Sequence, residues 1–148
     1  MARYTPHKER RPGSAVVENW GPPRDSWAVI VGGFMANVQV AILPHPCLGT
    51  PCWFWKGARG DDYGDFQLAG TKVAKASRAS WIIHHGPIPF RQWVLHKCDV
   101  KQCVNPDHLF LGRCVDNTRD YGAKLTSGRM RLAREYAASH FSSLFATL

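Results

Sequence analysis

The chain contains the stretch HKCDVKQCVNPDH at residues 96–108. Cys98, Cys103 and His108 follow one another there at Cys-x4-Cys-x4-His spacing, and His96 stands two residues ahead of the first cysteine. Structural zinc sites take four such Cys and His ligands. A loop this short cannot form a hydrophobic core of its own, so metal bonds would replace packing. The stretch therefore predicts a zinc-binding loop with three of its four ligands.

The fourth zinc ligand must come from another part of the chain. Cys52, which opens a short aromatic segment, is the first candidate, and Cys47 and Cys114 follow. Five cysteines are an odd number, and two of them share a loop with histidine, which favours a metal in a reducing compartment over a disulfide framework. Four protein ligands would leave no open position, so this zinc is expected to be structural.

Composition indicates one ordinary domain with a polyanionic partner. The chain has 148 residues, of which 45% are hydrophobic, and this argues against wholesale disorder. Its net charge of +8 favours nucleic acid as the partner. Basic residues are dense in the second half, and together they predict a face that follows phosphates: Lys72, Lys75, Arg78, Arg91, Lys97, Lys101, Arg113, Arg119 and Lys124.

No membrane segment is expected. The most apolar run, residues 27–43, is shorter than the about 20 residues that a span requires, and it contains Gly32, Gly33 and Asn37. The run begins too late for a signal peptide. We therefore expect a cytoplasmic protein with no membrane partner.

Three regions are expected along the chain. Residues 1–46 form a basic, proline-broken lead-in followed by an apolar segment, in which 27–31 and 34–43 resemble two strands around Gly32-Gly33, although a buried helix would give a similar run. Residues 47–129 form the main domain, and 130–148 a C-terminal extension that is helical from about residue 129. Within the main domain we expect strands at 52–55, 65–69, 93–96 and 109–112, a helix at 74–85, and a helix at 117–124 with Asp116 as its N-cap.

This order of elements carries a resemblance to a known family. The pattern Leu95-His96-x-Cys98-x4-Cys103-x-Asn105-Pro106-x-His108-Leu109, followed by Leu111-Gly112 and Asp116-Asn117-x2-Asp120, resembles the HNH and His-Cys box endonucleases of the ββα-metal superfamily. Matching residues upstream extend the resemblance to about residues 52–129, and small HNH nucleases of phages and mobile introns are the most similar. The resemblance implies an α+β fold, with a ββα-metal nuclease core of short antiparallel strands, a zinc-stapled loop and flanking helices.

The resemblance also implies a role for each matching residue. His96 would be the general base, Asn117 would bind a catalytic Mg²⁺ or Mn²⁺, and Arg78 would contact the phosphate. Relatives often have histidine immediately before this arginine, whereas this chain has Ser77, which puts a secondary phosphate contact in doubt. Structural zinc would be held by Cys52, Cys98, Cys103 and His108.

The chemistry of these residues suits hydrolysis of double-stranded DNA. A neutral histidine can take a proton from water at cellular pH. An asparagine carbonyl is an oxygen ligand of the kind magnesium prefers, but it needs the DNA phosphate to complete the site. We expect 5′-phosphate and 3′-hydroxyl ends, in an intron-homing or phage setting, with action in the host cytoplasm if a phage encodes the protein.

Two other functions remain open. A homodimer also remains open, although the sequence shows no recognisable dimer interface. A catalytically inactive zinc-stabilised DNA-binding protein would leave His96 and Asn117 without a role. A zinc-stapled interaction domain would leave the basic charge unexplained.

Overall fold

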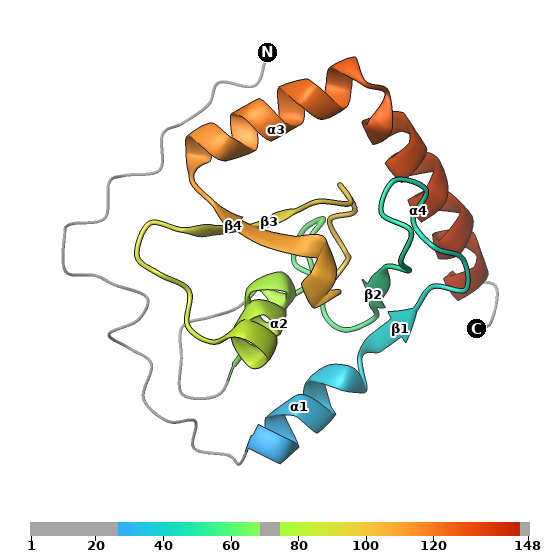
Figure 1. Cartoon of the computed structure of the whole chain (residues 1–148). Coiled ribbons are helices and arrows are strands. Elements are labelled where there is room, and N and C mark those ends of the chain that lie inside the picture. The colour runs from blue at the N-terminus through green and yellow to red at the C-terminus, as the bar shows by residue number, and fades with distance from the viewer. Residues whose placement is uncertain (1–26, 69–74, 146–148) are drawn as a thin grey trace.

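The computed structural model describes residues 27–68 and 75–145, with side chains as far as residue 140. Helices and short antiparallel strands alternate along the chain (Figure 1), which confirms the expected α+β class. None of the helices in the described part combines the length and apolar character needed to cross a bilayer. The elements are α1 (Trp27–Met35), β1 (Val38–Val40), β2 (Trp53–Trp55), α2 (Ala76–His85), β3 (Trp93–His96), the 3₁₀ turn η1 (Pro106–His108), β4 (Leu109–Gly112), α3 (Cys114–Thr126) and α4 (Arg129–Phe145).

A hairpin followed by a helix forms the centre of the fold. Strands β3 and β4 pair antiparallel, with His96 opposite Leu109 and Trp93 opposite Gly112. Residues 97–108, most of the stretch quoted first, therefore connect the two strands, and helix α3 follows directly (Figure 1). A side chain at Gly112 would approach Leu95 Cδ1 to 2.8 Å, so any larger residue where the strand gives way to the helix would have to displace the Leu95 side chain. The strands expected at 93–96 and 109–112 and the strand–strand–helix order are confirmed.

Helix α3 starts earlier than expected. Its N-cap is Arg113 rather than Asp116, which lies at the third helical position. The Asp116 carboxylate accepts a hydrogen bond from the Arg113 backbone N–H at 2.8 Å. An acid in the first turn also interacts favourably with the helix dipole. Asp116 therefore stabilises the N-terminus from within the first turn of the helix. The predicted N-cap position was wrong by about one turn.

The apolar run 27–43 forms a helix and a strand, not the two strands expected. Residues Ile30 and Phe34, one helical turn apart, are buried in the core against Trp55 and Leu68. Periodic burial on one helix face outweighs the local preference of the glycines for a turn. Only Val38–Val40 is extended, and it pairs with the aromatic strand β2.

The region between β2 and α2 also departs from expectation. Strand 65–69 does not form: Asp65 makes one isolated bridge to Lys75, and Ala69 lies outside the described residues. Helix α2 confirms the expected helix, although it begins at Ala76 and residue 74 is not described. It ends at His85 and is capped by Gly86, whose φ of 93° favours glycine.

A second core lies around the three cysteines of the loop region. Cys52, Cys98 and Cys103 are buried together with Phe54 and Tyr136. Tyr136 comes from α4, the expected C-terminal helix, which Figure 1 shows on the side of the molecule that carries β1 and β2. The C-terminal extension therefore packs on the loop that the sequence assigned to zinc.

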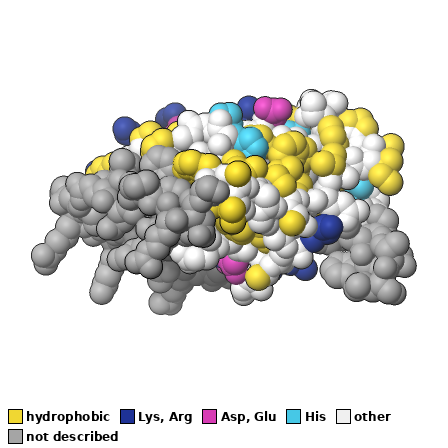
Figure 2. All heavy atoms as spheres, turned by 90° about the horizontal axis from the view of Figure 1, so that it is seen from below, with side chains coloured by type: hydrophobic (Ala, Val, Ile, Leu, Met, Phe, Trp, Pro, Cys, Tyr) yellow, Lys and Arg dark blue, Asp and Glu magenta, His cyan; other side chains and the backbone are white. Residues whose placement is uncertain are grey.

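Exposed apolar side chains gather on α1 and the segment around β1. Seen from below, Figure 2 shows hydrophobic side chains across the middle of the described surface and Lys or Arg toward its edges. No concentrated basic face is visible on the described residues from this side. The exposed apolar residues of this region are Trp27, Val29, Met35, Val40, Ile42 and Leu43.

Candidate functional site

Four buried side chains converge as a potential metal centre. Ligand atoms of Cys52, Cys98, Cys103 and His108 lie within 4.8 Å of one another, and this is the group that the described residues offer. All four residues are buried. The structure thus brings Cys52 to the loop, whereas Cys47 and Cys114 lie outside the cluster. A set of three thiols and one imidazole fits a structural zinc ion.

Strand β2 brings Cys52 to the loop through backbone bonds. Trp55 N–H donates to Gln102 C=O at 3.0 Å, and Val104 N–H donates to Trp53 C=O at 2.8 Å. The strand therefore runs alongside residues 102–104, and the cysteine just ahead of it meets Cys103. These contacts link segments far apart in sequence, which is why spacing alone left three candidates for the fourth ligand.

His108 is oriented from two sides. Its Nδ1 lies 3.5 Å from the Sγ of Cys52 and 3.6 Å from the Sγ of Cys103. Its Nε2 lies 2.7 Å from the Oγ1 of Thr50. When Nδ1 serves as the ligand, Nε2 carries the proton and donates it to the Thr50 hydroxyl. A histidine that binds a metal commonly donates its other ring N–H to an acceptor in this way.

The thiols interact strongly even without a cation. Burial alone would raise the pKa of Cys103, but hydrogen bonds from the Cys52 and Cys98 thiols hold it well below its usual range. The hydrogen bonds of the Cys52 thiol with Cys103 and with Cys98, followed by burial, raise the pKa of Cys52. Of these two thiols, Cys103 is therefore the one that ionises more readily. A bound cation would let all three sulfurs ionise, so the residues fit a metal.

His45 supports the loop and was missed by the sequence analysis. It is buried, its Nε2–H donates to Cys98 C=O at 3.0 Å, and its Nδ1 accepts from Cys47 N–H at 3.1 Å. Burial lowers its pKa, in keeping with a neutral ring whose two nitrogens are both bonded. It lies in the proline-rich segment 44–51, where no local pattern marks it, so only the fold shows that it braces the backbone of a candidate ligand.

His96 lies at the end of β3, half-buried and beside the metal loop. Its Nε2 lies 3.0 Å from Cys103 C=O. A carbonyl can only accept, so Nε2 carries the proton, and Nδ1 is the ring's proton acceptor in the neutral form. Burial lowers the pKa of His96, which favours that neutral form. The Tyr63 ring lies alongside, with centroids 6.0 Å apart.

The other two expected catalytic residues lie on different helices. Asn117 is exposed in the first turn of α3, and Arg78 is half-buried in the first turn of α2. Asp120 and Lys124 follow Asn117 on the same side of α3, because positions three and seven residues apart share a helix face. His96, Asn117 and Arg78 thus come from three elements outside the metal cluster.

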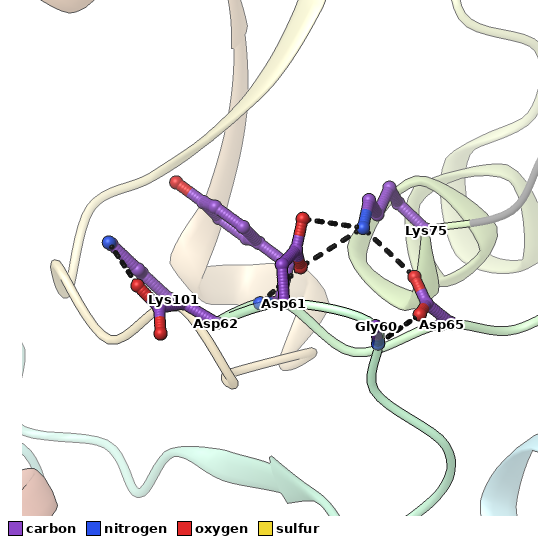
Figure 3. A network of polar contacts seen from close by, with 7 residues as sticks. Gly60, Asp61, Asp62, Asp65, Lys75 and Lys101 are labelled. Carbon is purple, nitrogen blue, oxygen red and sulfur yellow. Dashed lines mark hydrogen bonds and ion pairs between the residues drawn. The ribbon is translucent and has the colours of Figure 1, made fainter.

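Several basic residues of the expected phosphate-following face are engaged in ion pairs. Figure 3 shows Lys75 between Asp61 and Asp65, at 3.0 and 2.9 Å, and Lys101 with Asp62 at 2.9 Å. The hydrogen bonds that Lys75 donates to the carboxylates of Asp65 and Asp61 raise its pKa. These pairs anchor the loop that carries Tyr63 to α2 and to the metal loop. Lys72 lies outside the described residues.

Comparison with known proteins identifies the same segment. Residues 74–119 match the sequence model of a family described as HNH endonuclease. Protein 2.8 of Escherichia phage T7 is 35% identical over 71 residues, which are 47% of this chain and 48% of that protein. The match therefore spans about half the length of the phage protein. No solved structure matches this chain.

The matched segment contains most of the expected site. It includes His96, Asn117 and Arg78, along with three of the four metal-cluster residues. Cys52 lies upstream of it, and helix α4 lies downstream. The chain thus carries a segment that matches the HNH endonuclease family, and the metal cluster is completed by a cysteine from outside that segment.

Proposed function

From the HNH endonuclease match at residues 74–119, we propose that this protein is a metal-dependent DNA endonuclease. It hydrolyses phosphodiester bonds with a histidine general base and one divalent cation, and leaves 5′-phosphate and 3′-hydroxyl ends. The observation that carries the mechanism is the bond from His96 Nε2–H to Cys103 C=O, which leaves Nδ1 to accept a proton.

Zinc is a scaffold in this proposal. Cys52, Cys98, Cys103 and His108 would be its four ligands, and a closed tetrahedral set leaves no position for water or substrate. Bound zinc would hold the 97–108 connection in one conformation. Because the Cys103 carbonyl belongs to that connection, the same scaffold orients the ring of His96.

His96 supplies the proton chemistry. In its neutral form Nδ1 removes a proton from the attacking water, while Nε2–H stays bonded to the carbonyl. Keeping that bond prevents the ring from rotating during transfer. The lowered pKa of His96 supports this role, because an unprotonated base is required before each turnover.

Asn117 and Arg78 act at the reacting phosphate, Asn117 through a bound cation and Arg78 by direct contact. Asn117 offers its side-chain oxygen to Mg²⁺ or Mn²⁺, and the ion would stabilise charge on the phosphate and on the leaving oxygen. One amide is a poor cation site, so DNA completes it and the ion binds weakly without DNA. Arg78 contacts the scissile phosphate or its neighbour with a guanidinium suited to phosphate geometry.

Double-stranded DNA is the proposed partner. The net charge of +8 supports a polyanionic substrate, with binding that weakens as salt rises. Similarity to a T7 protein supports a phage setting, in which the nuclease would act in the cytoplasm of the host cell.

Plasmid cleavage tests this proposal. Zinc-loaded protein should nick or linearise supercoiled plasmid with Mg²⁺, and His96→Ala should reduce the rate by about 10²-fold or more. The matched control is His85→Ala, which removes an exposed histidine from the end of α2. Ligation and end-labelling of the products would identify the ends. DNA retarded in a gel but uncut with every divalent ion would instead identify an inactive DNA-binding protein, and wild-type cutting by His96→Ala would rule out the assigned base.

A further inference from the structure

Lys124, in the last turn of α3, is a buried lysine that bonds to three separate segments. Its side chain is 3% exposed. Its Nζ donates to His96 C=O at 2.7 Å and to Asp99 at 2.9 Å, and it pairs with Asp120 one turn earlier on α3. An ammonium has three hydrogens, so the end of β3, the metal loop and α3 itself use all of them.

Burial of this charge needs a reason beyond packing. Lysine is almost never fully buried unless it is paired, because removing its charge from water is costly. Asp99 adopts a positive φ of 59° where it meets Lys124, a conformation that L-residues seldom adopt. Burial raises the pKa of Asp99, while the lysine opposes that shift. An apolar side chain could fill this space without the cost of a buried charge. What lysine adds over an apolar residue is its set of bonds to His96, Asp99 and Asp120.

Contact with DNA phosphate does not explain the lysine. The sequence grouped Lys124 with the residues of a phosphate-following face, but the structure buries it and commits its donors to protein oxygens. That expectation is therefore corrected for this residue. The remaining role is to link β3, which carries the proposed base His96, to α3, which carries the proposed cation ligand Asn117.

The geometry gives this link a direct connection to the site. His96 is held at two points. Its ring donates to the Cys103 C=O, and the backbone carbonyl of His96 accepts from Lys124 Nζ. On the helix side, Asp120 and Lys124 share a face with Asn117, two turns from the lysine. Movement of α3 along β3 would break the Lys124 bond to the His96 carbonyl, so the bond sets how the helix and the strand lie together.

We propose that Lys124 is a positioning residue, which holds the His96 strand and the Asn117 helix in the relative placement needed for cleavage. This inference rests on the nuclease function proposed above. Lys124 touches neither DNA nor the cation. Its loss should therefore lower kcat and raise the Mg²⁺ concentration for half-maximal rate, while KM for DNA stays nearly constant.

The full-length, zinc-loaded protein with Lys124→Met provides the test. Methionine has similar length but no donors, and Lys56→Met is the matched control at an exposed lysine outside the network. We expect kcat to fall about tenfold or more, because small misplacements of catalytic groups lower the rate by such factors. KM should stay within about twofold of the wild-type value. Bound zinc per chain and the circular dichroism spectrum should match those of the wild type. Lys56→Met should cleave normally.

A second variant covers the case in which Lys124→Met does not fold. Asp120→Ala removes the attachment on α3, at a side chain that is one-third exposed, and keeps the lysine bonds to His96 and Asp99. It should show a smaller loss of kcat, about threefold to fivefold, with the same rise in Mg²⁺ requirement.

Distinct results overturn the inference and the function beneath it. Folded, zinc-loaded Lys124→Met with wild-type kcat and Mg²⁺ dependence overturns the positioning role. So does Asp120→Ala with wild-type kinetics if the methionine variant cannot be folded. A change in KM alone would identify a DNA contact and overturn it as well. Failure of the wild-type protein to cleave with any divalent ion removes the nuclease proposal itself, and the positioning role with it.

Discussion

The Nε2 of His108 lies 2.7 Å from the Oγ1 of Thr50, and the bond between them points Nδ1 of the same ring toward the sulfurs of Cys52 and Cys103. A residue in the turn before β2 thus selects which nitrogen of a potential ligand faces the metal cluster. Partners of this kind strongly influence metal affinity although they never touch the metal.

Replacing Thr50 with valine should weaken zinc binding. Thr50→Val keeps the shape of the side chain but removes the acceptor for His108 Nε2–H. We expect zinc affinity to fall by about 10-fold to 100-fold, the usual effect of losing a second-sphere partner. Competition with a chromophoric chelator measures it. Thr118→Val, an exposed threonine on α3, should bind zinc normally, and equal affinities for all three proteins would contradict the assigned orientation.

Removal of the metal should unfold the loop region. Three thiols and an imidazole are buried together there, and bonds to a metal ion would hold them in one arrangement. We expect one zinc per chain by atomic spectroscopy, and loss of thermal stability after chelation. Cys52→Ser should lose most of the zinc, whereas Cys47→Ser should keep it. Retention of stoichiometric zinc by Cys52→Ser would show that another residue completes the site.

Asn117→Ala should raise the magnesium requirement for cleavage. The alanine variant removes the proposed oxygen ligand from an exposed position, so folding and zinc content should be unaffected. Cleavage rates measured across a magnesium titration should show a large loss at low concentration and partial recovery at high concentration. Thr118→Ala is the neighbouring control. An unchanged titration curve for Asn117→Ala would mean that the cation is held elsewhere.

Tyr136→Phe should destabilise the fold through the metal region. The Tyr136 hydroxyl donates to Leu43 C=O at 2.6 Å and accepts from Cys52 N–H at 3.2 Å. Without it, a buried N–H and a carbonyl both lose their partner, at a cost of about 1–3 kcal/mol in the free energy of unfolding. Urea denaturation measures this. Tyr121→Phe, at a tyrosine that is 53% exposed, should have little effect, and equal stability of the two variants would count against the role of α4 as a brace.

The local part of the fold was predictable from the sequence. The stretch at residues 96–108 indicated a metal loop between strands 93–96 and 109–112, and both strands form. Histidine and cysteine spacing, strand patterning and a following helix are short-range signals, because each depends on residues a few positions apart. The same signals carried the resemblance that the family match supports.

Ambiguous local signals produced the errors. The run at 27–43 is apolar enough to suit a strand or a buried helix, and only packing of Ile30 and Phe34 against the core selects the helix. Asp116 was placed at the right helix but at the wrong cap position, because aspartate is favoured both as the N-cap and in the first turn, where its carboxylate accepts a bond from the N-cap N–H.

The sequence by itself determined a zinc-type loop, a strand–strand–helix order and a set of candidate catalytic residues. Only the tertiary structure decided that Cys52 joins the loop, that Thr50 and His45 orient it, and that Lys124 joins His96 to α3. These contacts connect residues far apart in the chain, and their formation depends on how β2 and α3 pack against the loop. No local spacing encodes that packing, since it arises from burial of apolar and polar groups over the whole domain.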